Sequence, residues 1–148
     1  MGLVMLRRFV LLILLFAMVG TGAELLLMKH TEGFWQLVPV FLIVTGLIVL
    51  GWHAIFGGAA TVRVFQGTMT LVAISGVAGI SLHYRGNVEF ELEMYPSLSG
   101  LGLFWEAMQG ATPALAPGTM TVLGLLGLAY TYGYSLTTNS KDHPTRGV

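Results

Sequence analysis

Glu24 is the residue best placed to do chemistry, because it is a carboxyl group inside an apolar run. The run from Phe9 to Met28 holds no other charge. A charged side chain in a membrane is costly unless it is protonated, paired or hydrated, so it suggests a function by default. His83 and Arg85 fall at the same predicted depth. We expect these three side chains to form a polar cluster that either serves transport or locks helices together.

Two histidines are candidate ligands for a metal ion or a haem group. His30 and His83 follow different apolar runs and fall at the same predicted membrane border. Imidazole pairs ligate haem iron, and with Glu24 or Glu89 the same pair could hold a divalent metal ion. Neither histidine lies well inside a run, so two ordinary interfacial side chains are the simpler interpretation. The sequence implies no particular cofactor.

Three glutamates alternate with apolar residues in the stretch from Asn87 to Tyr95. On an extended chain Glu89, Glu91 and Glu93 share one outer acidic face. That face could bind a cation or a basic partner, but carboxylates spaced along a strand do not converge, so a solvated face is the simpler interpretation. The rival is a helix, on which Glu89 and Glu93 stack and Glu91 points elsewhere.

Composition excludes several classes of function. The 148 residues carry seven basic and seven acidic side chains and no cysteine. The chain therefore has no basic footprint for nucleic acid, no disulfide and no thiolate nucleophile. A P-loop, a GxSxG nucleophile motif, an HExxH zinc motif and a dinucleotide fingerprint are all absent. An enzyme is thus less expected than a non-catalytic protein.

The elements that carry these side chains are predicted to be membrane spans. Charged residues make up 9% of the chain and the mean hydropathy is +0.78. About 20 apolar residues cross a hydrocarbon core as a helix, and four runs reach that length: 9–28, 35–56, 64–82 and 113–134. Thr112 and Pro113 suit the N-cap and first position of the last helix. We predict one all-α membrane domain, residues 1–135, built as an antiparallel bundle of four transmembrane helices.

Basic residues indicate the orientation of the bundle. With both termini in the cytoplasm, Lys29 and Arg85 lie outside, and the inner side holds a larger basic set: Arg7, Arg8, Arg63, Lys141 and Arg146. Residues 136–148 are expected to form a disordered cytoplasmic tail. The absence of cysteines and of N-x-S/T sequons fits a bacterial inner membrane.

The first run leaves an alternative open. Arg7 and Arg8, an apolar stretch and the small residues Thr21, Gly22 and Ala23 resemble a cleavable signal peptide. The apolar run resumes afterwards and reaches the length of a full span, which favours an uncleaved helix. Cleavage would leave three helices in the same orientation.

An outer cap, residues 83–112, is predicted between the third and fourth spans. It begins with the extended stretch described above and continues, after Pro96, as a short amphipathic helix to about Gln109. One face of this helix is apolar, and Trp105 stands at its border. Such a helix is typical of one lying in the membrane interface. The residues of that face are Leu98, Leu101, Phe104 or Trp105, and Met108.

Rows of small residues predict where the helices pack, because membrane helices meet through close backbone approach. Three rows share this property: Ala17, Gly20, Thr21 and Glu24; Gly67, Ser75, Ala78 and Gly79; Ala116, Gly124, Gly127 and Thr131. The first row predicts that Glu24 faces the bundle.

Three functions are compatible with these features. The leading hypothesis is a non-enzymatic accessory or structural subunit that packs, in the bilayer, against other membrane subunits or copies of itself. The second is a homo-oligomeric transporter or channel that uses Glu24. The third is a haem- or metal-binding membrane subunit that uses His30 and His83.

Overall fold

The computed structural model describes residues 2–132, which form helices and contain no strand. The helices are α1 (Leu3–Leu27), α2 (Phe34–Phe56), α3 (Ala59–Met94), α4 (Gly100–Gln109) and α5 (Gly118–Thr131). Helices α1, α2 and α3 are long and apolar enough to cross a membrane, whereas α5 is a shorter apolar helix. The all-helical prediction is confirmed. The predictions for residues 133–148 lie outside the described range.

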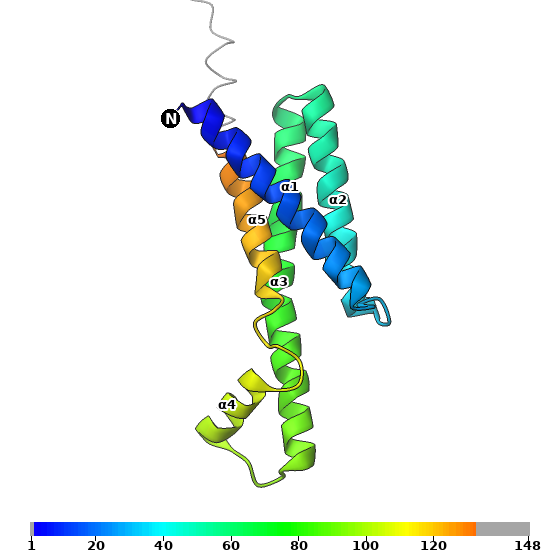
Figure 1. Ribbon diagram of the computed structural model, residues 1–148, viewed down its shortest axis with the longest axis vertical. Helices are drawn as coiled ribbons and strands as arrows, with labels where there is room; N and C mark the ends of the chain where they lie inside the picture. Colours follow the sequence, from blue (N-terminus) through cyan, green and yellow to red (C-terminus); the bar gives the residue numbers. More distant parts are fainter. Residues whose placement is uncertain (1, 133–148) are drawn as a thin grey trace, which may run out of the picture.

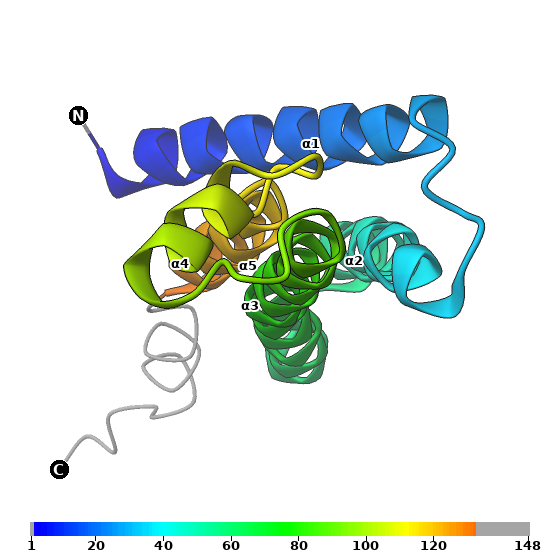
Figure 2. The same ribbon diagram turned by 90° about the horizontal axis from the view of Figure 1, so that it is seen from below.

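Four of these helices contribute to one apolar core. Helix α3 is central and packs against α5, α2 and α4, while α1 packs against α5 and α2. Figures 1 and 2 show α1 lying across one side of the other helices, at an angle to α3. Much apolar surface points outward; Phe16 and Leu27 are each 84% exposed. Exposed apolar area on this scale is typical of a protein whose outer surface is covered by lipid.

Helix α1 meets the core mainly through large residues. Leu14 and Met18 are fully buried, whereas Gly20 and Glu24 are exposed. A side chain added at Gly20 would meet nothing within 4 Å. Of the first row of small residues, Ala17 packs against the core and Thr21 is half-buried, so the row faces the bundle in part, but the prediction that Glu24 faces it is wrong. Leucine and methionine side chains fill the space that the angled helix leaves, so close backbone approach is not needed there.

Close approach occurs between α3 and α5. Gly124, Gly127 and Thr131 of α5 are buried, as the row of small residues predicts. A Cβ atom at Gly124 would lie 2.5 Å from the backbone nitrogen of Ala73 and 2.5 Å from the carbonyl oxygen of Met69. The glycine of α3 that meets α5 most closely is Gly76, which the sequence analysis did not select, whereas Gly67 faces open space.

Helix α5 begins at Gly118, five residues after the predicted start at Pro113. Residues 114–117 form turns, in which the amide of Ala116 donates to the carbonyl of Pro113 and that of Gly118 to the carbonyl of Leu115. Pro117 has no amide hydrogen, and its ring would clash with the carbonyl of Pro113 in a regular α-helix. The second proline therefore delays the helix.

Helix α3 continues without a break to Met94, so the extended stretch predicted at Asn87–Tyr95 is wrong and the helical rival is correct. Glutamate, leucine and methionine are all good helix formers, and a helix satisfies the backbone within itself. At about 1.5 Å per residue the 36 residues of α3 measure about 54 Å, against about 30 Å for a hydrocarbon core. Figure 1 shows α4 beside the far end of this helix.

Candidate functional site

The outer end of α3 is joined to α4 and the chain after it by one buried side chain, Asn87, which is 3% exposed. Its amide nitrogen donates to the carbonyl oxygens of Ala107 (2.8 Å) and Thr112 (2.7 Å). Its amide oxygen accepts from the backbone nitrogen (3.2 Å) and the hydroxyl (2.7 Å) of Thr112. Both donors and both acceptor positions of the amide are therefore used. Asn87 fixes α4 against α3.

Sequence reasoning missed this role of Asn87. The sequence analysis placed Asn87 at the start of an extended stretch and Thr112 at a helix cap. The only available signal was an asparagine, a poor helix former, in the interior of a helical stretch. Its partners lie 20 and 25 residues further along the chain, so no local pattern reveals them.

Helix α4 buries one face against α3 and leaves an apolar face exposed. Ala107 is completely buried, whereas Leu101 is 78% and Trp105 58% exposed. The ring of Phe104 lies 5.9 Å from that of Tyr84 and 5.5 Å from that of Trp105, measured between centroids. The exposed residues Leu101, Phe104 and Trp105, hereafter the α4 apolar face, belong to the amphipathic side that the sequence predicts.

The charged residues of the outer region do not form a single face. Glu89 and Glu93 are exposed one turn apart on α3, while Glu91 is half-buried and lies on the side of Asn87. Arg85 is exposed. Residues 83–112 contain four glutamates and one arginine, so this end of the molecule is acidic.

His30 and His83 lie side by side, with ring centroids 6.4 Å apart and ring planes tilted by 51°. The end of α1 positions His30. Lys29 adopts a left-handed conformation with φ of 52°. Its amide donates to the carbonyl oxygen of Leu26, and the amide of His30 donates to the carbonyl oxygen of Leu25 at 2.9 Å. These two bonds are those of a Schellman motif, with lysine at the position that glycine usually takes.

Helix α3 positions His83, whose Nδ1 lies 3.2 Å from the carbonyl oxygen of Pro113. A carbonyl only accepts, so Nδ1 carries the hydrogen and, in the neutral ring, Nε2 presents a lone pair. Burial, and then the neighbouring His83, lower the pKa of His30. Both effects favour the neutral form of that ring.

Glu24 does not join the predicted cluster. It is exposed on α1, and among residues 2–132 no hydrogen bond or ion pair links it to His83 or Arg85. A transport pathway enclosed by the helices of one chain would not be lined by the carboxyl group of Glu24. Glu24 would line a pathway only if several copies of the chain placed their α1 helices face to face.

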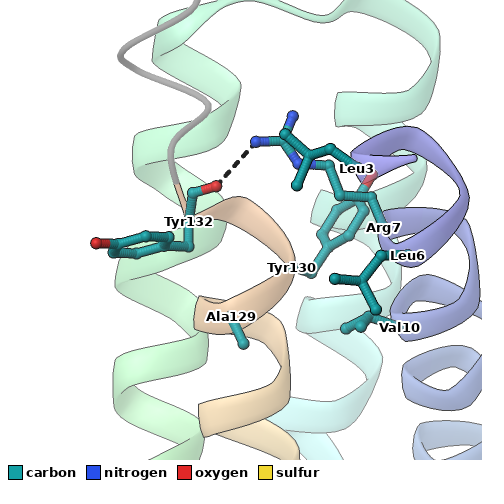
Figure 3. Close-up of a pocket in the computed structure, with 7 residues that line it drawn as sticks. All are labelled: Leu3, Leu6, Arg7, Val10, Ala129, Tyr130 and Tyr132. Carbon is teal, nitrogen blue, oxygen red and sulfur yellow. Dashed lines mark hydrogen bonds between the residues drawn. The ribbon is translucent and has the colours of Figure 1, made fainter. Parts of the chain in front are cut away.

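The opposite end of the molecule is held by other polar contacts. A cavity of about 220 Å³ lies between α1 and α5, and Figure 3 shows Arg7 beside it, with one guanidinium nitrogen donating to the carbonyl of Tyr132 at 2.9 Å. This bond satisfies a carbonyl at the end of α5, where the helix dipole is negative.

At the turn between α2 and α3, Nδ1 of His53 lies 2.7 Å from the hydroxyl of Thr61. Both contacts are structural.

No protein-family model matches the chain, and neither a curated protein nor a solved structure matches it.

Proposed function

We propose that this chain is a non-catalytic subunit of a larger membrane assembly, which it contacts through the α4 apolar face. The observation that supports this proposal is that Leu101 and Trp105 are exposed on a helix attached to the projecting end of α3. Apolar patches that are not covered by lipid mark docking surfaces. Asn87 holds α4 in place, so the surface is preformed and little ordering entropy opposes docking.

The proposal includes a topology with four spans. Helix α5 measures about 21 Å, and the turns after Pro113 add to the depth that this segment covers. Arg7 and Arg63 lie near the first residues of α1 and α3, at one end of the helices. At the other end, Lys29 lies in the loop after α1 and Arg85 in the outer part of α3. The positive-inside rule then favours both termini in the cytoplasm and α4 outside. The absence of cysteines and of N-x-S/T sequons fits a bacterial inner membrane.

The acidic character of the outer region favours a protein partner over the lipid surface. Anionic lipid headgroups would repel this acidic end of the molecule, in which Glu106 of α4 is exposed next to Trp105 and Glu89 and Glu93 are exposed on the side of α3 turned away from Asn87. A partner with an apolar surface and nearby basic residues would complement this end in both charge and hydrophobicity. Another membrane subunit with such an outer segment is the proposed partner.

The proposal predicts that Leu101→Ser combined with Trp105→Ser removes the partner while leaving the chain folded. Two apolar anchors at the centre of an interface often contribute about 2 kcal/mol each, so recovery of the complex should fall at least about tenfold. The measurement is purification of the tagged chain from native membranes in mild detergent, followed by native electrophoresis. Ser97→Ala, an exposed position in the turn before α4, is the control and should leave recovery unchanged.

Two outcomes would contradict the proposal. One is a wild-type chain that migrates alone under conditions that preserve other membrane complexes. The other is a complex that survives in the double variant, since docking would then use another surface. Two differently tagged copies of the chain, expressed together, distinguish a foreign partner from self-association.

A further inference from the structure

We infer that His30 and His83 form a binding site for a divalent transition-metal ion of the zinc and copper class, with water completing the coordination. The first argument is the arrangement of the two rings. They come from different elements, the end of α1 and the outer part of α3, and lie 6.4 Å apart between centroids. Imidazole is a preferred ligand for zinc, copper and nickel, whereas magnesium and calcium require oxygen.

The second argument is the orientation of His83. Metal-binding histidines commonly donate one ring N–H to a backbone carbonyl, which fixes the tautomer and directs the other nitrogen to the metal. The contact between Nδ1 of His83 and the carbonyl of Pro113 has this form and leaves Nε2 as the ligand atom. Pro113 follows directly after Thr112, which Asn87 holds, so the carbonyl is itself fixed in position.

The third argument is the backbone that carries His30. A left-handed lysine costs free energy relative to glycine, and strained residues of this kind gather at functional sites. The bond from the amide of His30 to Leu25 depends on this conformation and sets where the imidazole stands. The loop therefore holds His30 against His83 through defined backbone geometry.

A metal ion bound by His30 and His83 would have two protein ligands, and its other coordination positions would be open to water. With metal–nitrogen bonds of about 2.0–2.1 Å, two rings on one tetrahedral ion have centroids about 5 Å apart, so the rings must close by about 1 Å. Within residues 2–132 no group of three or more histidine, aspartate or glutamate side chains surrounds a common point. Water therefore takes the remaining positions, and the ion exchanges more readily than in a closed site with four protein ligands. Bound there, it links the loop after α1 to α3.

The test uses the full chain, purified in detergent without a polyhistidine tag, stripped with a chelator and titrated with Zn²⁺ in a calorimeter. Wild-type protein should bind one ion per chain, and its thermal unfolding temperature should rise with Zn²⁺, because the ion binds the folded state. His83→Asn keeps a donor for the carbonyl of Pro113 but removes Nε2. His30→Ala removes the other ligand. Each should weaken binding at least about tenfold and abolish the thermal shift.

His143→Ala is the matched control for nonspecific binding by an imidazole and should change neither readout. Titration with Cu²⁺ adds an independent measure, because nitrogen hyperfine structure in the electron paramagnetic resonance spectrum should indicate two ring nitrogens, and one in each variant. Binding that His83→Asn and His30→Ala both leave intact would overturn the inference. So would a haem absorption band after reconstitution that depends on both histidines, since the pair would then be a haem site. These outcomes do not depend on whether the α4 apolar face binds a partner.

Discussion

Gly124→Ala is expected to lower the free energy of unfolding by about 1–3 kcal/mol, although it adds only one methyl group. The new Cβ atom would lie 2.5 Å from both the nitrogen of Ala73 and the carbonyl oxygen of Met69. Both atoms belong to the backbone of α3 and cannot rotate away, so α3 and α5 must separate. Reversible unfolding of the purified protein in mixed micelles, with increasing denaturing detergent, measures the change.

Gly67→Ala is the matched control, because it is the same substitution on a helix of the same core. A side chain at Gly67 meets nothing within 4 Å. Alanine also forms helices better than glycine, so this variant should unfold at the same detergent fraction as wild type or at a higher one. If Gly124→Ala were as stable as Gly67→Ala, the close contact between α3 and α5 would not exist.

Asn87→Leu is expected to release α4 from α3. Leucine has nearly the shape of asparagine and is a better helix former, so α3 itself should persist. The variant loses four hydrogen bonds and leaves polar groups of Ala107 and Thr112 without their partner. A buried polar group without a partner costs about 1–3 kcal/mol, so amides of residues 100–112 should exchange with deuterium at least about tenfold faster.

Ser81→Ala is the control for Asn87→Leu, since Ser81 lies on the same helix and its hydroxyl bonds only to the carbonyl of Val77 within that helix. Exchange in α4 should then stay at the wild-type rate. Exchange in α2 should stay unchanged in both variants, because the hydrogen bonds of the Asn87 side chain go to Ala107 and Thr112 and not to α2. Unaltered exchange of α4 in Asn87→Leu would mean that packing alone holds it.

Local patterns predicted the parts of this fold that depend on local physics. The length and hydropathy of a run decide whether it can cross a membrane, so the existence of the long helices was predictable, and the run 35–56 became Phe34–Phe56. The helix bounds were less predictable, since the run 9–28 became Leu3–Leu27 and the run 64–82 became Ala59–Met94. The late start of α5 was not predictable, because Pro113 and Pro117 both suit a helix start. Only their spacing of four residues, which would make the ring of Pro117 clash with the carbonyl of Pro113 in a helix, favours the second proline.

The errors in the outer region have a common cause. Over nine residues, Glu89, Glu91 and Glu93 alternate with apolar residues in a way that fits a strand and a helix about equally. The contacts that hold α4 and the chain after it against this stretch involve Ala107 and Thr112, which are distant in sequence. The orientation of Glu24 was missed because the packing rule for small residues does not consider that Leu14 and Met18 can fill a wider gap.

The sequence singled out the candidate metal ligands by residue type, but their geometry was not predictable. His30 and His83 were expected at one membrane border, and the structure places them next to each other. Nothing in the sequence indicates that Lys29 takes a left-handed conformation, since glycine is the residue that normally signals it. The contact of His83 with Pro113 also joins segments that no motif connects.

The unbroken course of α3 makes it a mechanical lever. Its 36 residues form one continuous helix without proline, which joins the part packed in the core to the part that carries α4. A tilt of about 10° within the bilayer would swing the tip, about 24 Å further out, through roughly 4 Å. Changes in bilayer thickness alter the tilt of membrane helices. If the partner proposed above binds α4, it would therefore be displaced when the surrounding membrane becomes thinner or thicker.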